Sequence, residues 1–250
     1  MYNNIKILYH QGKQFIPDVT TAKVPGIFRG RPIIGTAKVD ETELVEMCPV
    51  NAISVNPVSI DLGKCTFCGE CALRFPEKIT FTTDYKISTN DRESLVIKEG
   101  DDKPVSVNPD KVRPEIQKLF GRSMKLRQVS AGGDNSCEWE LGAANNVQFD
   151  MGRFGIEFVA SPRHADGIAI TGPITENMAE ALQICYDATP DPKIIVLVGT
   201  DAISGGIFAG SPALNRTFLE NHTVDLYIPG NPAHPLTIIN GLLDLTRKRK

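Results

Sequence analysis

The chain has 250 residues with a formal net charge of −3 at pH 7, a length that suits one substantial domain and a smaller module. Its charges of both signs are interspersed, so it lacks the basic surface that nucleic-acid binding requires, and no apolar run approaches the ~20 residues that cross a bilayer. These properties exclude nucleic acid as a partner and direct membrane insertion. We expect a cytoplasmic protein, either free or peripheral on the cytoplasmic face of a membrane complex.

The first half of the chain predicts a small α+β module between an arm and a linker. Residues 1–35 contain several Pro and Gly and little periodicity, which is typical of an extended arm that packs on a neighbour. Residues 36–83 form the expected module, with helices near 40–47 and 68–74 and strands near 52–55, 58–60 and 79–82. Residues 84–113 mix one hairpin pattern with acidic and Pro-containing turns, and we interpret them as a linker.

The second half, residues 114–250, alternates apolar strands with helices. The strands are expected within LRQV, IEFVA, DGIAITG, KIIVLVG and VDLYIPG, and helices within SCEWELGAANN, ENMAEALQICYDA and the segment from Pro235. This alternation predicts a parallel sheet with helices on both faces, and we expect a flavodoxin-like α/β domain. Ligands bind beyond the carboxyl ends of such strands. The loops of interest are therefore those at 130–137, 199–206 and 229–235.

Four of the six cysteines are gathered between positions 48 and 71, which indicates metal ligation rather than a disulfide framework. An iron–sulfur cube takes three thiolates from a C-x2-C-x2-C turn and a fourth from a remote Cys-Pro. This chain offers one such set, which predicts one [4Fe-4S] cluster in a ferredoxin-like domain: Cys48, Cys65, Cys68 and Cys71.

The pattern of lost cysteines supports a single cluster. In a two-cluster ferredoxin, each Cys-Pro thiolate serves the cluster whose other ligands come from the opposite repeat. In this chain the Cys-Pro position of the second repeat is occupied by Phe75. In the first repeat, the three positions that would hold cysteines before Cys48 are occupied by Leu44, Glu41 and Lys38. These four positions are the ligands of one and the same cluster. The chain therefore lacks the whole ligand set of that cluster and retains the complete ligand set of the other. A structural zinc site is the alternative, but three cysteines at successive x2 spacing fit it poorly.

From Leu126 onward the chain resembles the small subunit of group 4 [NiFe]-hydrogenases, including that of formate hydrogenlyase, which is related to the 20 kDa subunit of respiratory complex I. The resemblance is carried by RFGIEFVASPRHAD, TGPIT, PDPKIIVLVG, SGGIF and IPGNPAHP, and the earlier FRGRP is also similar. It implies an electron-transfer subunit whose partners are a hydrogenase large subunit-like protein, the other subunits of a multi-subunit complex, and a soluble ferredoxin.

The family holds a second, proximal [4Fe-4S] cluster, and this chain departs from that pattern. The resemblance places the four ligand positions at Asp134, Cys137, Asp201 and Asn231, so one thiolate is left. Carboxylate and amide oxygens replace thiolate poorly at iron–sulfur clusters. We therefore expect no cluster at this site, although its oxygen atoms could serve a hard cation if they converge.

Three functions stay open on this sequence. The leading hypothesis is an iron–sulfur electron-transfer subunit of an oxidoreductase complex, with no catalytic centre on the chain itself. The alternatives are a non-redox scaffold subunit of such a complex, and a module that binds a metal or small molecule in the vacated cleft. The loss of the proximal ligands argues against hydrogen activation by the complex.

Overall fold

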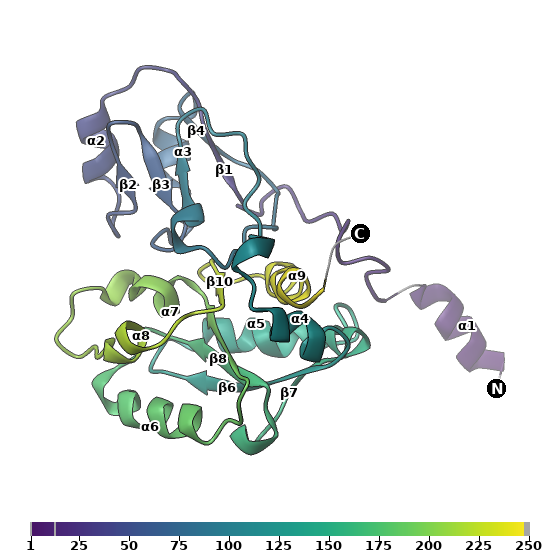
Figure 1. Ribbon diagram of the computed structural model, residues 1–250. Coiled ribbons are helices and arrows are strands. Elements are labelled where there is room, and N and C mark those ends of the chain that lie inside the picture. The colour runs from purple at the N-terminus through teal and green to yellow at the C-terminus, as the bar shows by residue number, and fades with distance from the viewer. Residues whose placement is uncertain (1, 13, 248–250) are drawn as a thin grey trace.

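The computed structural model of the chain describes residues 2–12 and 14–247. Its larger part is built around a five-stranded parallel sheet (Figure 1) with the strand order β10-β9-β8-β6-β7. Every residue of β8 and β9 is buried, as expected for central strands that are covered on both faces. The strands are β6 (Met124–Ser130), β7 (Ile156–Phe158), β8 (Gly167–Thr171), β9 (Ile194–Val198) and β10 (Leu226–Ile228).

Helices cover both faces of this sheet (Figure 1) and bury two apolar cores. Ile168 and Ile170 of β8 face one core, and Ala169 between them faces the other, because successive strand residues point to opposite sides. The first core is covered by α6 (Glu176–Asp187), α7 (Thr200–Ser204) and α8 (Thr217–Asn221). The second is covered by α4 (Pro114–Phe120), α5 (Ser136–Ala144) and α9 (Pro235–Thr246). The predicted parallel sheet with helices on both faces is thus confirmed.

The smaller N-terminal region is antiparallel. It holds two sheets, with the orders β1-β4 and β2-β3-β5, and two short helices. The Asp40 carboxylate caps the first helix by accepting from the backbone N–H groups of Thr42 and Glu43, at 3.0 and 3.1 Å. These elements are β1 (Pro32–Ile34), α2 (Glu41–Glu46), β2 (Ile53–Ser54), β3 (Ser59–Asp61), α3 (Glu70–Arg74), β4 (Ile79–Phe81) and β5 (Val96–Lys98).

Two predictions about the flanks of this region were wrong in part. Residues 2–11 of the expected extended arm form helix α1 (Tyr2–Gln11), and the end of the arm is strand β1, which pairs with β4. The expected linker forms no hairpin of its own, because β5 pairs with β3 of the small region. The arm and the linker therefore both contribute strands to the small region, and residues 36–83 do not complete it alone.

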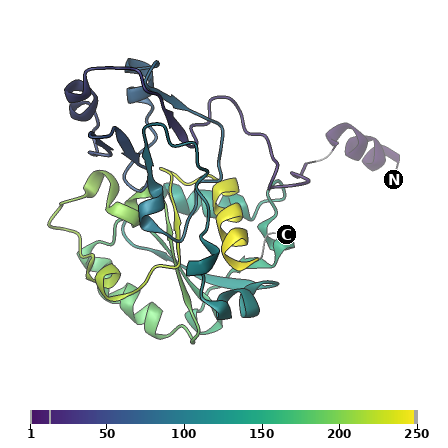
Figure 2. The ribbon, with the colours of Figure 1, turned by 45° about the horizontal axis from the view of Figure 1, so that its top comes forward.

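The remaining elements are single turns of 3-10 helix and the isolated α1. Helix α1 has no buried residue and lies apart from the rest of the chain in both views (Figures 1 and 2). No helix within residues 2–12 and 14–247 is long and apolar enough to span a membrane. The 3-10 turns are η1 (Arg92–Leu95), η2 (Pro109–Lys111), η3 (Met151–Phe154), η4 (Pro162–His164) and η5 (Gly206–Phe208).

The two regions share one core. Residues of the small region and residues from the α6 side of the parallel sheet belong to the same apolar cluster. At the junction, a Cβ on Gly63 would lie 2.8 Å from Cγ2 of Ile203 in α7, so this glycine permits a close approach between the two parts. Helix α7 is therefore packed between the parallel sheet and the cysteine-bearing loop.

Candidate functional site

The four clustered cysteines line one cavity of the small region, which we call the thiol cavity. Cys48 follows α2, Cys65 and Cys68 lie in the loop after β3, and Cys71 is in α3. Cys65 and Cys71 are buried, Cys48 is half-buried and Cys68 is exposed. The structure therefore brings together all four residues that the spacing selected, and it leaves one of them accessible from outside.

The walls of the thiol cavity are mainly apolar, and backbone N–H groups reach its sulfur atoms. The N–H of Ala52 donates to Cys48 Sγ and that of Phe67 donates to Cys65 Sγ, both at 3.3 Å. Gly69 has a left-handed φ of 85°, which allows the loop to turn between Cys68 and Cys71. Such N–H donors stabilise negative charge on sulfur and orient the ligands. The apolar lining residues include Val50, Ile53, Ile60 and Phe81.

Burial keeps the thiols of Cys65 and Cys71 protonated. It raises the pKa of Cys65 to about 12, and the other three cysteines add to this effect. Burial likewise raises the pKa of Cys71 to about 11. Four thiolates could therefore exist together in this cavity only if a strongly cationic group compensated their charge. Iron ions supply that charge, so the donor set fits an iron–sulfur cluster.

The arrangement of the thiols does not match a site for a single metal ion. Within the part of the chain that the structure describes, no three His, Cys, Asp or Glu side chains are close enough to hold one metal ion. A cube with one thiolate per iron has its four ligands at its four corners, and so needs them farther apart than a mononuclear site does.

The positions of the missing proximal ligands lie at the carboxyl ends of the parallel strands, where the sheet topology predicts a site. Cys137 is in the first turn of α5, and its Sγ fits beneath Gly199, where a Cβ would collide with it. Asp201 is in α7, directly after β9, and Asp134 is in the loop after β6. The carboxylates of Asp134 and Asp201 are close enough to each other and to Cys137 to influence their pKa values.

A residue that the sequence analysis missed completes this group. Glu138 accepts hydrogen bonds from Ser130 Oγ at 2.5 Å and Thr171 Oγ1 at 2.7 Å, and its charge acts on both Cys137 and Asp201. It follows Cys137 directly on α5, so its place in the sequence could have suggested it. We call Asp134, Glu138 and Asp201, together with Cys137, the acidic site.

The groups of the acidic site have pKa values that are shifted in opposite directions. Burial raises the pKa of Asp201 to about 6, and the negative charges of Asp134 and Glu138 add to that effect. Burial raises the pKa of Cys137 to about 12, so this lone thiol is a poor ligand. The pKa of the exposed Asp134 is lowered, because its carboxylate accepts from the hydroxyl and backbone N–H of Ser136.

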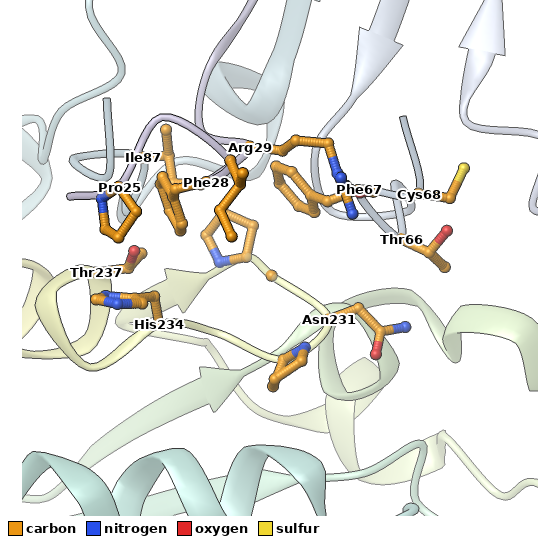
Figure 3. A pocket seen from close by; sticks show the side chains of 14 residues that line it. Pro25, Phe28, Arg29, Thr66, Phe67, Cys68, Ile87, Asn231, His234 and Thr237 are labelled. Carbon is orange, nitrogen blue, oxygen red and sulfur yellow. Dashed lines mark hydrogen bonds between the residues drawn. The ribbon is translucent and has the colours of Figure 1, made fainter. Parts of the chain in front are cut away.

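Asn231 lies beside the acidic site and lines a different cavity of about 380 Å³ (Figure 3). This cavity separates the Thr66–Cys68 loop of the small region from the Pro229–Pro232 loop, and Cys68 opens onto both it and the thiol cavity. Arg29 closes one side by donating from Nε to the carbonyl of Phe67. The cysteine loop and the end of the parallel sheet thus face each other across this space.

One hydroxyl joins the two sites directly. Thr200, the first residue of α7, donates from Oγ1 to the carbonyl of Cys65 at 2.9 Å and approaches the carbonyl of Gly230 at 3.2 Å. Its side chain is fully buried. No local pattern predicts this contact, because it joins residues that are 135 positions apart.

The larger, C-terminal region is similar to known proteins. Residues 135–245 match the family model described as NADH ubiquinone oxidoreductase, 20 Kd subunit. The probable membrane-bound hydrogenase subunit mbhJ of Pyrococcus furiosus is 37% identical over 129 residues, which cover 52% of this chain and 77% of that protein. Formate hydrogenlyase subunit 7 of Escherichia coli is 37% identical over 130 residues, which cover 52% of this chain and 51% of that protein.

A solved structure is also similar. It is that of the membrane-bound sulfane sulfur reductase, an archaeal respiratory membrane complex, and the similar chain is 27% identical with a TM-score of 0.45. The match covers 52% of this chain and 72% of that chain.

Proposed function

Because the chain belongs to the family of the 20 kDa subunit of NADH–ubiquinone oxidoreductase, we propose that it is an iron–sulfur electron-transfer subunit of an oxidoreductase complex. The complex is related to energy-converting hydrogenases and respiratory complex I. The chain holds one [4Fe-4S] cluster, bound by Cys48, Cys65, Cys68 and Cys71. The observation that carries this proposal is the convergence of these four thiols on one apolar cavity.

The residues of the thiol cavity have separate tasks in this proposal. When bound, the cluster supplies a reversible one-electron couple. Cys65 and Cys71 hold it in the apolar interior, while the N–H groups of Ala52 and Phe67 stabilise negative charge on sulfur. Cys68, the exposed ligand, marks the side on which electrons enter or leave.

The C-terminal region supplies the docking fold rather than a second redox centre. We assign its sheet to the flavodoxin-like class from its strand order, which is 2-1-3-4-5 when counted along the chain. Its vacated proximal site has one thiol, and burial keeps that thiol protonated. Electrons carried by this chain therefore stay in the ferredoxin-like region, and hydrogen activation is not assigned to it.

The partners follow from the relatives. A membrane-bound hydrogenase subunit and a formate hydrogenlyase subunit are among them, so the proposed assembly is a multi-subunit complex with a hydrogenase large subunit-like protein. This chain would bind peripherally on the cytoplasmic side of that complex and exchange electrons with a soluble ferredoxin.

Iron and sulfide analysis of the purified, anaerobically reconstituted chain, together with electron paramagnetic resonance, tests the proposal. We expect about four irons per chain and one S = 1/2 signal on reduction. Cys68→Ser should lower the iron content and change or abolish the signal, whereas Cys185→Ser, which removes a half-buried cysteine of α6, should leave both unchanged. Eight irons, or two interacting signals, would refute the single-cluster assignment. No iron would refute the electron-transfer role.

A further inference from the structure

Asp201 is a buried carboxylate that lacks a partner where one would be expected. Its side chain is 9% exposed, and its Oδ1 atom has no hydrogen-bond partner among the described residues. A buried ionised carboxylate in that state is costly, because it has lost water and gained no donor. The group is therefore suited to hold a proton.

The charged groups around Asp201 favour the same state. The negative charges of Asp134 and Glu138 both act on Asp201. The thiol of Cys137, which belongs to the same site, supplies no positive charge to compensate them. The cation on the neighbouring chain segment is Arg216, but its guanidinium donates to backbone carbonyls, including those of Ala202 and Ile203 at 2.8 and 2.9 Å. Burial and like charge together raise the pKa of Asp201 to about 6, close to the pH of the cell interior.

The helix that carries Asp201 is in contact with the thiol cavity's own loop. Thr200, the preceding residue, donates to the carbonyl of Cys65, and Ile203 packs on Gly63. The negative charges of Asp134 and Glu138 act on Asp201, and its Oδ1 atom lies against Gly206, just beyond the end of the same helix. One rigid turn of helix thus separates a carboxylate that can be protonated from a loop that carries a proposed cluster ligand.

We propose that Asp201 takes up a proton from solvent when the ferredoxin-like region accepts an electron, so that this chain couples electron transfer to proton binding. The inference rests on the proposed [4Fe-4S] cluster. One electron from a low-potential donor such as dithionite or reduced ferredoxin enters the cluster, and one proton from water forms the O–H bond on the Asp201 carboxylate. Asp134, which is exposed, connects the buried group with solvent.

The coupling has a simple electrostatic origin. Each electron added to the small region makes an ionised carboxylate nearby less favourable, and each proton on that carboxylate makes the electron more favourable. The low exposure of the helix between them limits screening by salt. The reciprocal effect is what a redox titration detects.

The experiment is a redox titration of the reconstituted full chain at pH values from 5 to 8, followed by visible absorbance. The midpoint potential of the wild-type protein should become more negative as pH rises through this range. Asp201→Asn should remove that pH dependence, and Asp134→Asn should move it to lower pH by withdrawing a negative charge. Glu180→Gln, which removes an exposed carboxylate from α6, should behave as the wild type.

Infrared difference spectra provide a second readout that does not depend on the potential. Reduction at pH 7 should add the C=O stretch of a protonated carboxylic acid in the wild-type protein and not in Asp201→Asn. A chain with four irons whose potential does not vary with pH, or an Asp201→Asn variant that retains the variation and the band, would overturn the proton proposal alone. A chain that binds no iron would overturn both this inference and the function on which it rests.

Discussion

The thiol cavity and the acidic site each contain a glycine turn directly before a short helix, but their side chains handle negative charge in opposite ways. Gly69 and Gly199 both adopt left-handed φ values, of 85° and 90°. Burial raises the pKa of Cys65 and of Cys137 alike to about 12. The first site has four thiols that only a cationic group can ionise together, whereas the second has one thiol beside three carboxylates.

We propose that the acidic site is a cluster site that has lost its soft ligands and kept its scaffold, and this difference shows what then remains. The thiolate set and its iron would have carried negative charge that was compensated internally. The carboxylates of the acidic site repel one another, since the negative charges of Asp134 and Glu138 act on Asp201, and the nearby Arg216 is bound to backbone carbonyls instead. A proton on Asp201 is the simplest compensation that the described residues offer.

The largest expected effect comes from restoring the lost thiols. In the triple variant Asp134→Cys, Asp201→Cys and Asn231→Cys, the new cysteines join Cys137 on a scaffold whose glycine turns are intact. We expect the iron content to rise from about four to about eight per chain after reconstitution, as measured by iron and sulfide analysis. Asp187→Cys, which adds one thiol at the end of α6, is the control and should leave it at about four. An unchanged content in the triple variant would mean that the turns no longer form a cluster site.

The second effect concerns the helix between the two sites. Arg216 donates to the carbonyls of Pro173, Ala202 and Ile203 at 2.8 to 2.9 Å and holds the end of α7. Arg216→Met should lower the free energy of unfolding by about 3 kcal/mol, because buried carbonyls lose a charged donor. Urea denaturation measures this, and Arg163→Met, at an exposed position of η4, should change it by less than about 0.5 kcal/mol. Equal stability of the two variants would contradict the role of Arg216.

The pH dependence of stability gives a third, smaller effect. The folded pKa of Asp201, about 6, lies above the ordinary aspartate value of 3.8. The stability from its protonated form is therefore full below the unfolded pKa and is lost as pH rises through about 6. Asp201→Asn should be more stable than the wild type by about 2 kcal/mol at pH 8 and equal to it near pH 4. Thermal melts at both pH values decide this, and an equal difference at the two would rule out the raised pKa.

The smallest effect is expected at the hydroxyl that joins the sites. Thr200→Val keeps the shape of the side chain and removes the donor to the carbonyls of Cys65 and Gly230. It should cost about 1 kcal/mol of unfolding free energy. Thr217 is the matched control, since it is also the first residue of a short helix but is exposed. Thr217→Val should be nearly neutral, and a similarly neutral Thr200→Val would show that the contact contributes little.

These differences also explain which features could be read from the sequence. The four cysteines were found because ligand spacing is a local pattern, and the central strands β8 and β9 were found because each is an almost continuous apolar run. The pairing of β1 with β4 and of β5 with β3 could not be found, since these strands have three residues each and pair with distant segments. Short strands carry too little alternation to be recognised.

The acidic site was predicted only in part, for a related reason. The resemblance supplied Asp134, Cys137, Asp201 and Asn231 one by one, but their surroundings depend on folding. Glu138 is held in the site by hydrogen bonds from hydroxyl groups of two different strands. The contact between α7 and the cysteine loop joins the two halves of the chain. Burial of Asp201 arises from that packing, so its raised pKa has no local signature in the sequence.

The strand pairing of the small region limits how the protein can be divided. A fragment of residues 36–83 would leave β4 without β1 and β3 without β5, and would expose two unpaired strand edges that favour aggregation. A fragment for separate study of the cysteine-bearing half therefore has to begin before Pro32 and continue beyond Lys98. Even then, the surface of this fragment that packs against Ile203 of α7 in the full chain would be exposed to water.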